Sequence, residues 1–204
     1  KILLLWDESV WEKPESLELE GLGSARSSKA KRLTRIKPGF YHPPGKPIFV
    51  PGMNWLGVLL VGMTGVPCLV KLRWWSNRGK FATDKRTQEV KLLKALAMWK
   101  QRVIHVFDQG FAGTFWLLQL QHVNALFILR WRKDYKLIDT LGRHLKAWKL
   151  TQGKRSVDYR MVWDARKRCE RKAGLSYTQV THSETQQVLW LIVSRMGKGR
   201  SPWY

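Results

Sequence analysis

The stretch KILLLWD at residues 1–7 is an apolar run of strand length that ends in an acid. A second run of the same kind, RVIHVFD, occupies residues 102–108. Short continuous apolar runs are typical of strands buried on both faces, and an acid at the end of such a strand is held at the edge of a rigid sheet. Asp7 and Asp108 are therefore the first candidates for functional carboxylates.

The segments between and after the two runs alternate between predicted strands and helices. Two strands joined by a tight turn precede an amphipathic helix, whose apolar residues recur at three- and four-residue spacing. A second helix and a further strand follow Asp108. The predicted elements are strands at 53–63 and 67–75, a helix at 84–101 that Thr83 can cap, a strand at 102–108, a helix at 111–121 and a strand at 125–132.

The order strand, hairpin, helix, strand, helix, strand is that of the RNase H-like fold, a mixed sheet flanked by helices. In that topology the first strand lies beside the strand that follows the first helix, so Asp7 and Asp108 would end neighbouring strands. We therefore expect an α/β protein. Its first predicted part is a core at 1–138, which contains a basic loop at 12–50. A β-rich insertion follows at 139–197, with the strand candidates AWKL, SVDYRMVWD and QVLWLIV. Residues 198–204 are predicted to begin the return of the chain to the core.

The net charge indicates which classes of partner the protein can bind. The 204 residues carry 37 Lys and Arg against 15 Asp and Glu, a formal net charge of +22. Such an excess is most often accepted by DNA or RNA. An anionic membrane surface is the rival partner, but the sequence lacks a basic helix with an exposed apolar face, so we expect no membrane. A generally basic surface remains the simplest alternative.

The candidate DNA-binding residues are cations of the acid-free stretch 21–83 and of the region after residue 129. The loop at 26–37 is expected to contact phosphates, which gives affinity without sequence specificity; a solvated flexible loop is the alternative. Trp74, Trp75 and Trp131 alternate with arginines, which suits base stacking, but Trp74 and Trp75 point to opposite faces of one strand. The candidates are Arg26, Lys29, Lys31, Arg32, Arg35, Lys37, Arg73, Arg78, Arg130 and Lys133.

Two strand-end carboxylates in a basic protein suit metal-dependent chemistry on phosphodiesters. Displacement at phosphorus is assisted by two metal ions about 3.5–4 Å apart. Mg²⁺ prefers oxygen ligands, and Mn²⁺ can substitute for it. Asp7 and Asp108 are thus the candidate catalytic and metal-binding residues. The alternative is that each aspartate only caps a turn or a helix.

Other side chains that could carry chemistry are expected in the core. His105 lies three residues before Asp108, so alternation along a strand places it on the opposite face. Cys68 lies in an apolar run, and its distance in sequence from Cys169, without a metal-ligand spacing, argues against a zinc site and a disulfide. The tryptophans expected in the core are Trp6, Trp99, Trp116 and Trp190.

The motifs around these residues resemble the DDE-type transposases of bacterial insertion sequences, in the cut-and-paste group whose RNase H-like core carries a β insertion. The resemblance runs almost end to end. It rests on WDESVWEKPES (6–16), SSKAKRLTRIKPGFY (27–41), FVPGMNW (49–55), WWSNRG (74–79), HVFDQGFAG (105–113), FILRWRKDYKL (127–137) and SPWY (201–204).

The resemblance implies that Asp7 and Asp108 are the first two carboxylates of a triad that binds Mg²⁺. It also implies that the partner is double-stranded DNA, both at transposon ends and at the target, with a possible homodimer in the DNA complex. The location it implies is the bacterial cytoplasm, in association with the nucleoid. The alternatives are a non-catalytic nucleic-acid-binding remnant of a transposase and a stand-alone RNase H-like nuclease.

The sequence departs from the pattern of that family at the third carboxylate. It is a Glu within a Tyr-x2-Arg-x3-Glu-x6-Lys signature, and no such string occurs in the sequence. Glu170 has Arg166 at the right spacing, but Trp163 and Tyr177 replace the Tyr and the Lys, so we interpret the match as chance in an Arg-rich stretch. We expect the third carboxylate beyond Tyr204 and interpret the chain as a fragment, inactive alone, of an active enzyme.

Overall fold

The computed structural model describes residues 2–13, 15, 21–27, 48–62, 64–80, 82–164, 168–197 and 202–204. The protein is mixed α/β, with more strand than helix. It divides into two compact units, residues 1–106 with 123–127 and residues 107–122 with 128–204. None of the described helices has the length and apolar character needed to cross a lipid bilayer.

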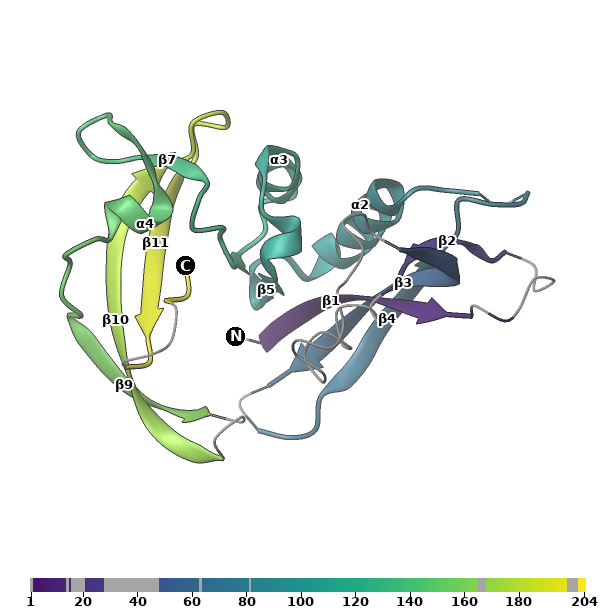
Figure 1. Cartoon of the computed structure of the whole chain (residues 1–204), viewed down its shortest axis with the longest axis horizontal. Helices are drawn as coiled ribbons and strands as arrows, with labels where there is room; N and C mark the ends of the chain where they lie inside the picture. The colour runs from purple at the N-terminus through teal and green to yellow at the C-terminus, as the bar shows by residue number, and fades with distance from the viewer. Residues whose placement is uncertain are drawn as a thin grey trace. The chain divides into compact units, whose positions relative to one another are not determined.

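The first unit is built on a mixed sheet with strand order β2-β3-β1-β5-β6, in which β4 also pairs with β3 (Figure 1). Strand β3 pairs antiparallel with β1, β2 and β4. The strands are β1 (Ile2–Glu12), β2 (Gly23–Arg26), β3 (Phe49–Val61), β4 (Cys68–Trp75), β5 (Val103–Phe107) and β6 (Phe127–Leu129), the last two of which reach the boundary between the units.

Helix α2 (Lys85–Leu96) provides apolar side chains to the core of this unit and is followed by the 3₁₀ helix η1 (Ala97–Arg102). Its sequence has no Gly or Pro, and Asp84 caps it by accepting a hydrogen bond from the backbone N–H of Thr87 at 2.9 Å. The buried core consists of Leu92, Leu93 and Leu96 of the helix with Leu4, Trp6, Leu56 and Val58 of the strands.

The second unit contains a five-stranded sheet with order β11-β10-β7-β8, in which β9 also pairs with β10. Phe107, Phe111 and Trp116 form an aromatic cluster with ring centroids 5.1–5.2 Å apart. The elements are η2 (Gln109–Phe111), α3 (Thr114–His122), β7 (Lys136–Ile138), β8 (His144–Lys146), α4 (Ala147–Leu150), β9 (Asp158–Asp164), β10 (Cys169–Thr181) and β11 (Val188–Arg195).

Most predicted elements are present, with corrected bounds. The hairpin of β3 and β4, the helix α2 and the strands β5, β9 and β11 lie where the pattern predicted them. The β-rich sheet begins at Lys136, close to the predicted start of the insertion at 139. The predicted strand at 125–132 shortens to three residues, Phe127–Leu129.

Four expectations about elements are wrong. Strand β1 continues to Glu12, so Asp7 lies in its middle, because β3 is long enough to pair along all of it. Part of the stretch 12–50 forms β2, which pairs with β3 although its own residues are poor strand formers. AWKL forms the helix α4, because an apolar segment of four residues fits the helical period of 3.6 as well as the strand period of 2. Asp84, and not Thr83, caps α2.

Three core assignments are also wrong. Cys68 is exposed on β4. Trp190 on β11 has an exposed fraction of 65%. Trp99 is half-buried in η1, whereas Trp6 and Trp116 are buried as predicted. Strand alternation alone does not say which face another element covers, so an apolar residue in a strand can lie on either side.

We predict that Gly52→Ala destabilises the first unit. A Cβ at Gly52 would lie 2.7 Å from the carbonyl oxygen of Trp11 and 2.9 Å from the Cβ of Ala25, so the backbones of β1 and β2 would have to move apart. The expected loss of unfolding free energy is about 1–3 kcal/mol in urea titrations. The control Ser24→Ala, at an exposed position of β2, should change it by less than about 0.5 kcal/mol; equal effects would contradict the close approach.

Candidate functional site

Asp7 lies on the face of the first sheet that α2 does not cover. Its neighbours Trp6 and Glu8 point to the opposite face, where Trp6 is 3% exposed, whereas Asp7 itself is exposed. The strand register places Asp7 opposite Gly57 of β3, and Gly57 opposite Leu72 of β4. The Asp7 side chain therefore lies exposed on the face of the sheet opposite to α2.

The indole of Trp55 covers Gly57, the cross-strand partner of Asp7. A Cβ at this position would lie 3.2 Å from the ring atom Cζ3 of Trp55 and 3.7 Å from Cδ1 of Leu69. The indole of Trp55 therefore leans over Gly57, in the place that a side chain would otherwise occupy. Gly57 is itself buried, so the indole of Trp55 and not an open space lies next to Asp7 on this row.

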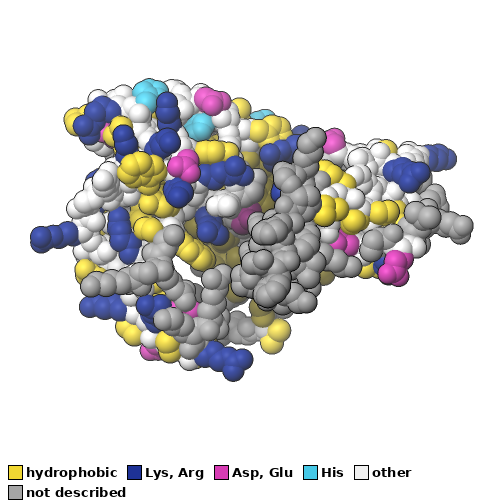
Figure 2. Space-filling view, in the orientation of Figure 1, with side chains coloured by type: hydrophobic (Ala, Val, Ile, Leu, Met, Phe, Trp, Pro, Cys, Tyr) yellow, Lys and Arg dark blue, Asp and Glu magenta, His cyan; other side chains and the backbone are white. Residues whose placement is uncertain are grey.

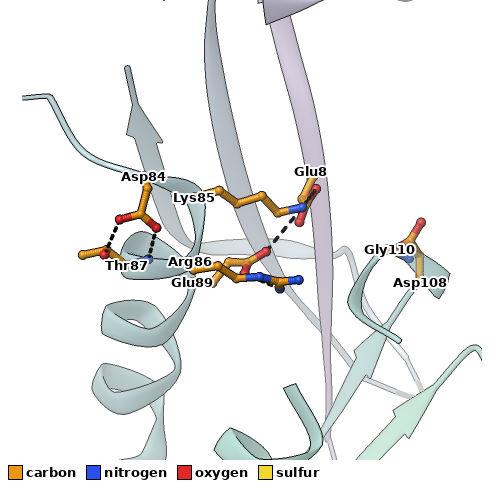
Figure 3. Close-up of polar contacts among 8 residues, drawn as sticks. All are labelled: Glu8, Asp84, Lys85, Arg86, Thr87, Glu89, Asp108 and Gly110. Carbon is orange, nitrogen blue, oxygen red and sulfur yellow. Dashed lines mark hydrogen bonds and ion pairs between the residues drawn. The ribbon is translucent and has the colours of Figure 1, made fainter. Parts of the chain in front are cut away.

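Glu8 belongs to an ion-pair cluster on the covered face, which Figure 3 shows. Lys85 Nζ lies 2.6 Å from Glu8 Oε2 and 3.5 Å from Glu89 Oε1, and Arg86 donates to Glu89 Oε2 at 2.8 Å. The side chain of Glu89 is fully buried. This cluster links β1 to α2 directly behind Asp7.

Burial raises the pKa of Glu89 to about 7 from its ordinary value of 4.5. Desolvation of the carboxylate is the largest cause, and hydrogen bonding with Glu8 adds to it, since two carboxyl groups can hydrogen-bond only if one carries a proton. Lys85 and Arg86 lower the pKa in opposition, but less strongly. Glu89 therefore holds its proton over most of the acidic range.

His105 has the core role that strand alternation predicted. It is 2% exposed, and its Nδ1 accepts a hydrogen bond from Trp6 Nε1 at 3.0 Å. Burial lowers its pKa to about 4, so the imidazole is neutral at pH 7. This contact joins β1 to β5 on the covered face.

Asp108 follows β5 and caps the short helix η2. Its Oδ1 accepts a hydrogen bond from the backbone N–H of Gly110 at 2.7 Å (Figure 3). Asp108 therefore has the capping role that was the alternative to metal binding in the sequence analysis. The hydrogen bond from Gly110 orients its carboxylate. Asp7 belongs to the first unit and Asp108 to the second, so their convergence on one metal stays a prediction.

The donor chemistry at Asp7 fits a hard cation. An exposed carboxylate suits Mg²⁺, which keeps several waters and needs only one or two protein carboxylates. Within the described ranges, no three His, Cys, Asp or Glu side chains are grouped so that they could hold a metal. Glu170 is exposed on β10 opposite Trp163.

The described cations among the DNA-binding candidates are all exposed. Arg73 lies opposite Leu56 and so points to the face opposite to Asp7. Arg78 lines a cavity of about 410 Å³ with Phe49 and Asn77. The described candidates are Arg26, Arg73, Arg78, Arg130 and Lys133, while Lys29, Lys31, Arg32, Arg35 and Lys37 lie outside the described residues.

On the face shown in Figure 2, the dark blue Lys and Arg side chains are spread over the surface and the magenta acids are few. Arg130 of the second unit stacks its guanidinium 4.6 Å from the ring centroid of Trp203. The described cations are therefore distributed over both units.

The structure also separates the three tryptophans that alternate with arginines. Trp74 is 61% exposed and Trp75 is half-buried on the opposite face. Trp131 is 7% exposed and packs edge-on against Tyr135 and His182, so the expectation that it stacks on a base is wrong.

Comparison with models of known protein families and with proteins of curated function found no match.

Sequence reasoning missed Trp55, Gly57 and Glu89. Trp55 and Gly57 become neighbours of Asp7 only through the register of β1 with β3, which hydrophobic patterns did not predict. A signal for Glu89 was present, because a glutamate surrounded by the apolar periodicity of α2 has to be buried.

We predict that Glu89→Gln makes the protein lose more stability on acidification. Because the folded-state pKa of Glu89 is raised, its stabilising contribution is complete below about pH 4.5 and is lost as the pH rises through 7. His105 has the opposite sign, since its contribution is complete above pH 6.5 and is lost as the pH falls through 4. Without the Glu89 carboxyl, the loss of stability that His105 causes on acidification is no longer opposed.

Urea unfolding followed by circular dichroism at pH 7 and pH 5 checks this prediction. Between these values, Glu89→Gln should lose up to about 1–3 kcal/mol more unfolding free energy than the unmodified protein. Glu170→Gln, an exposed glutamate of β10, is the matched control and should follow the unmodified protein. Parallel curves for Glu89→Gln and the unmodified protein would show that Glu89 is ionised in the folded state.

Proposed function

We propose that this chain is the core of a DDE-type transposase, an enzyme that cleaves and transfers DNA strands with the help of Mg²⁺. The observation that carries the proposal is the exposed carboxylate of Asp7, in the middle of β1 on the sheet face opposite to α2. A strand-borne carboxylate in a protein of formal net charge +22 is suited to bringing a metal ion and a phosphate together.

The strand order supports an RNase H-like fold. Strands β4, β3, β1, β5 and β6 follow one another across the sheet, with α2 between β4 and β5 in the chain and α3 between β5 and β6. This is the order of strands and helices expected from the sequence for that fold. It makes β1, which carries Asp7, the neighbour of β5, which Asp108 follows.

Strand alternation supports a shared site for the two aspartates. Trp6 and His105 meet on the covered face, Asp7 follows Trp6 by one residue, and Asp108 follows His105 by three. Odd offsets along a strand predict that both carboxylates leave the sheet on the other face. In the proposed site they would hold Mg²⁺, which would activate the attacking oxygen and stabilise the leaving one.

A non-catalytic DNA-binding role is the second candidate. The observation that favours it is the hydrogen bond from Gly110 to Asp108, since capping η2 is by itself a sufficient reason for an aspartate at this position. In this alternative the basic surface binds DNA and Asp7 has no metal. The two candidates differ in the effect of removing the charge of Asp108 while keeping its cap.

We predict that Asp7→Asn and Asp108→Asn, made in the complete protein, each lower Mg²⁺-dependent DNA cleavage at least about 100-fold. In the Asp108→Asn variant the side-chain amide oxygen could still accept the hydrogen bond from Gly110, so the fold and the affinity for DNA should be retained. Cleavage is measured by gel assay with Mg²⁺ and with Mn²⁺, and DNA binding by anisotropy. Retained cleavage in either variant would exclude that aspartate as a metal ligand.

The salt dependence of DNA binding tests the basic loop at 26–37. If its six cations each contact a phosphate, the logarithm of the binding constant should fall against the logarithm of salt concentration with a slope near about −5. Arg26→Ala should make the slope shallower by about 0.9. A slope for the unmodified protein shallower than about −2 would contradict this interface.

A further inference from the structure

A cavity of about 300 Å³ lies in the second unit, beside helix α4 and strand β11 (Figure 1). The segment 151–154, which follows α4 directly, forms one wall, and Arg195 at the end of β11 forms another. All of the lining residues belong to the second unit, so the cavity is formed without the first. Its volume is near the lower end of the range for small-ligand sites.

The segment 151–154, with the sequence TQGK, forms a tight turn. The backbone N–H of Lys154 donates to the carbonyl oxygen of Thr151 at 3.3 Å, and Gly153 has φ of +73°, in the left-handed region that favours glycine. Thr151 is 2% exposed, and its hydroxyl donates to the carbonyl oxygen of Ala147 in α4 at 3.3 Å. The turn is therefore fixed to α4, and it places the exposed Lys154 at the cavity.

The guanidinium of Arg195 is held in one orientation by two neutral acceptors. Its Nη1 donates to the hydroxyl of Ser176 at 2.7 Å, and its Nη2 donates to the carbonyl oxygen of Thr151 at 3.0 Å. No other hydrogen bond of this group is made within the described residues. A guanidinium has more N–H donors than these two bonds use, so Arg195 can still donate to a ligand in the cavity.

The positive charge of Arg195 is not compensated by an acid. Arg171 of the same unit is also half-buried, but it forms an ion pair with Asp164 at 3.3 Å. Among the described residues no carboxylate forms an ion pair with Arg195 or Lys154.

The lining of the cavity favours an anion. It contains two cations and no Asp or Glu, and the half-buried indole of Trp148 forms part of the wall. A half-buried cation without a counter-charge has lost part of its hydration, and a bound anion would offset that loss. The indole excludes water from one side, which strengthens the attraction between an anion and the two cations.

We propose that this cavity binds a phosphate group, held by Arg195 and Lys154. The planar guanidinium can donate two parallel N–H bonds to a phosphate, and the Lys154 ammonium adds a compact charge from another direction. A tetrahedral phosphate has oxygens on several sides and can meet cations from two elements, whereas the two oxygens of a carboxylate lie in one plane. The group is either a phosphate of a DNA backbone or a free phosphate compound. The inference does not require a metal ion at Asp7.

The experiment follows the cavity itself, by NMR of tryptophan indole N–H groups in the complete protein. The signal of Trp148 is assigned with Trp148→Phe, and inorganic phosphate is titrated in at constant ionic strength against chloride. The variants are Lys154→Ala and Arg195→Gln. Arg155→Ala is the matched control, because Arg155 is exposed and next to Lys154 but does not line the cavity.

Inorganic phosphate should shift the Trp148 signal of the unmodified protein to saturation. Lys154→Ala and Arg195→Gln should each weaken this binding about tenfold, because each removes a charge-assisted hydrogen bond. Arg155→Ala should change it less than about twofold. Lys154→Ala decides the result if Arg195→Gln fails to fold, since the Lys154 side chain is exposed and holds no other element.

A second titration, with a short DNA duplex and no divalent metal, identifies the source of the phosphate. If the source is a DNA backbone, the duplex shifts the Trp148 signal, and Lys154→Ala makes the salt slope of DNA binding shallower by about 0.9. If the source is a free compound, inorganic phosphate shifts the signal and the duplex does not.

Two results would overturn the inference. One is a Trp148 signal that neither inorganic phosphate nor the duplex shifts, and the other is equal phosphate binding by Lys154→Ala and the unmodified protein. Neither result touches the proposed function, which depends on the effect of Asp7→Asn on cleavage.

Discussion

The antiparallel pairing of β1 with β3 is the constraint on which the rest of the first unit depends. Ten residue pairs, from Leu3 with Val61 to Glu12 with Gly52, hold the two strands in one register. Because side chains alternate between faces, a slip of one residue would move Trp6 and Glu8 out of the core and Asp7 into it. The buried core, the ion-pair cluster and the exposure of Asp7 are three results of one register.

The covered face of this sheet combines apolar packing with buried polar groups of opposite behaviour. Glu89 and His105 are both enclosed, and in each case burial disfavours the charged form. The glutamate thereby gains affinity for a proton and the histidine loses it. Both side chains are consequently neutral at mildly acidic pH, and the charged groups near them, Lys85 and Arg86, are partly exposed on α2.

The sequence was sufficient for features that depend on local pattern, and insufficient for those that depend on pairing. The 3.6-residue periodicity predicted α2, and alternation predicted that His105 faces away from Asp108, because both are properties of one segment. The extension of β1 past Asp7 and the existence of β2 could not be read in this way, since both depend on β3 as a partner. For the same reason the sequence did not predict that Trp55 and Gly57 lie next to Asp7. The exposure of Trp74 and the burial of Trp131 depend on which faces other elements cover, and local pattern does not predict this.

Strand β4 has a property that concerns the solubility of the protein. In the described part of the chain it pairs with β3 alone, so its other edge presents unpaired backbone groups, and Leu69 and Leu72 beside that edge are half exposed. Such an edge can recruit a strand of another molecule and start aggregation. Lys71 lies between these two leucines and Arg73 follows Leu72, and their positive charges oppose pairing with a second copy of the same edge. The positive charge that suggests a polyanionic partner therefore also has a second use on this strand, because it disfavours edge-to-edge association between copies of the chain.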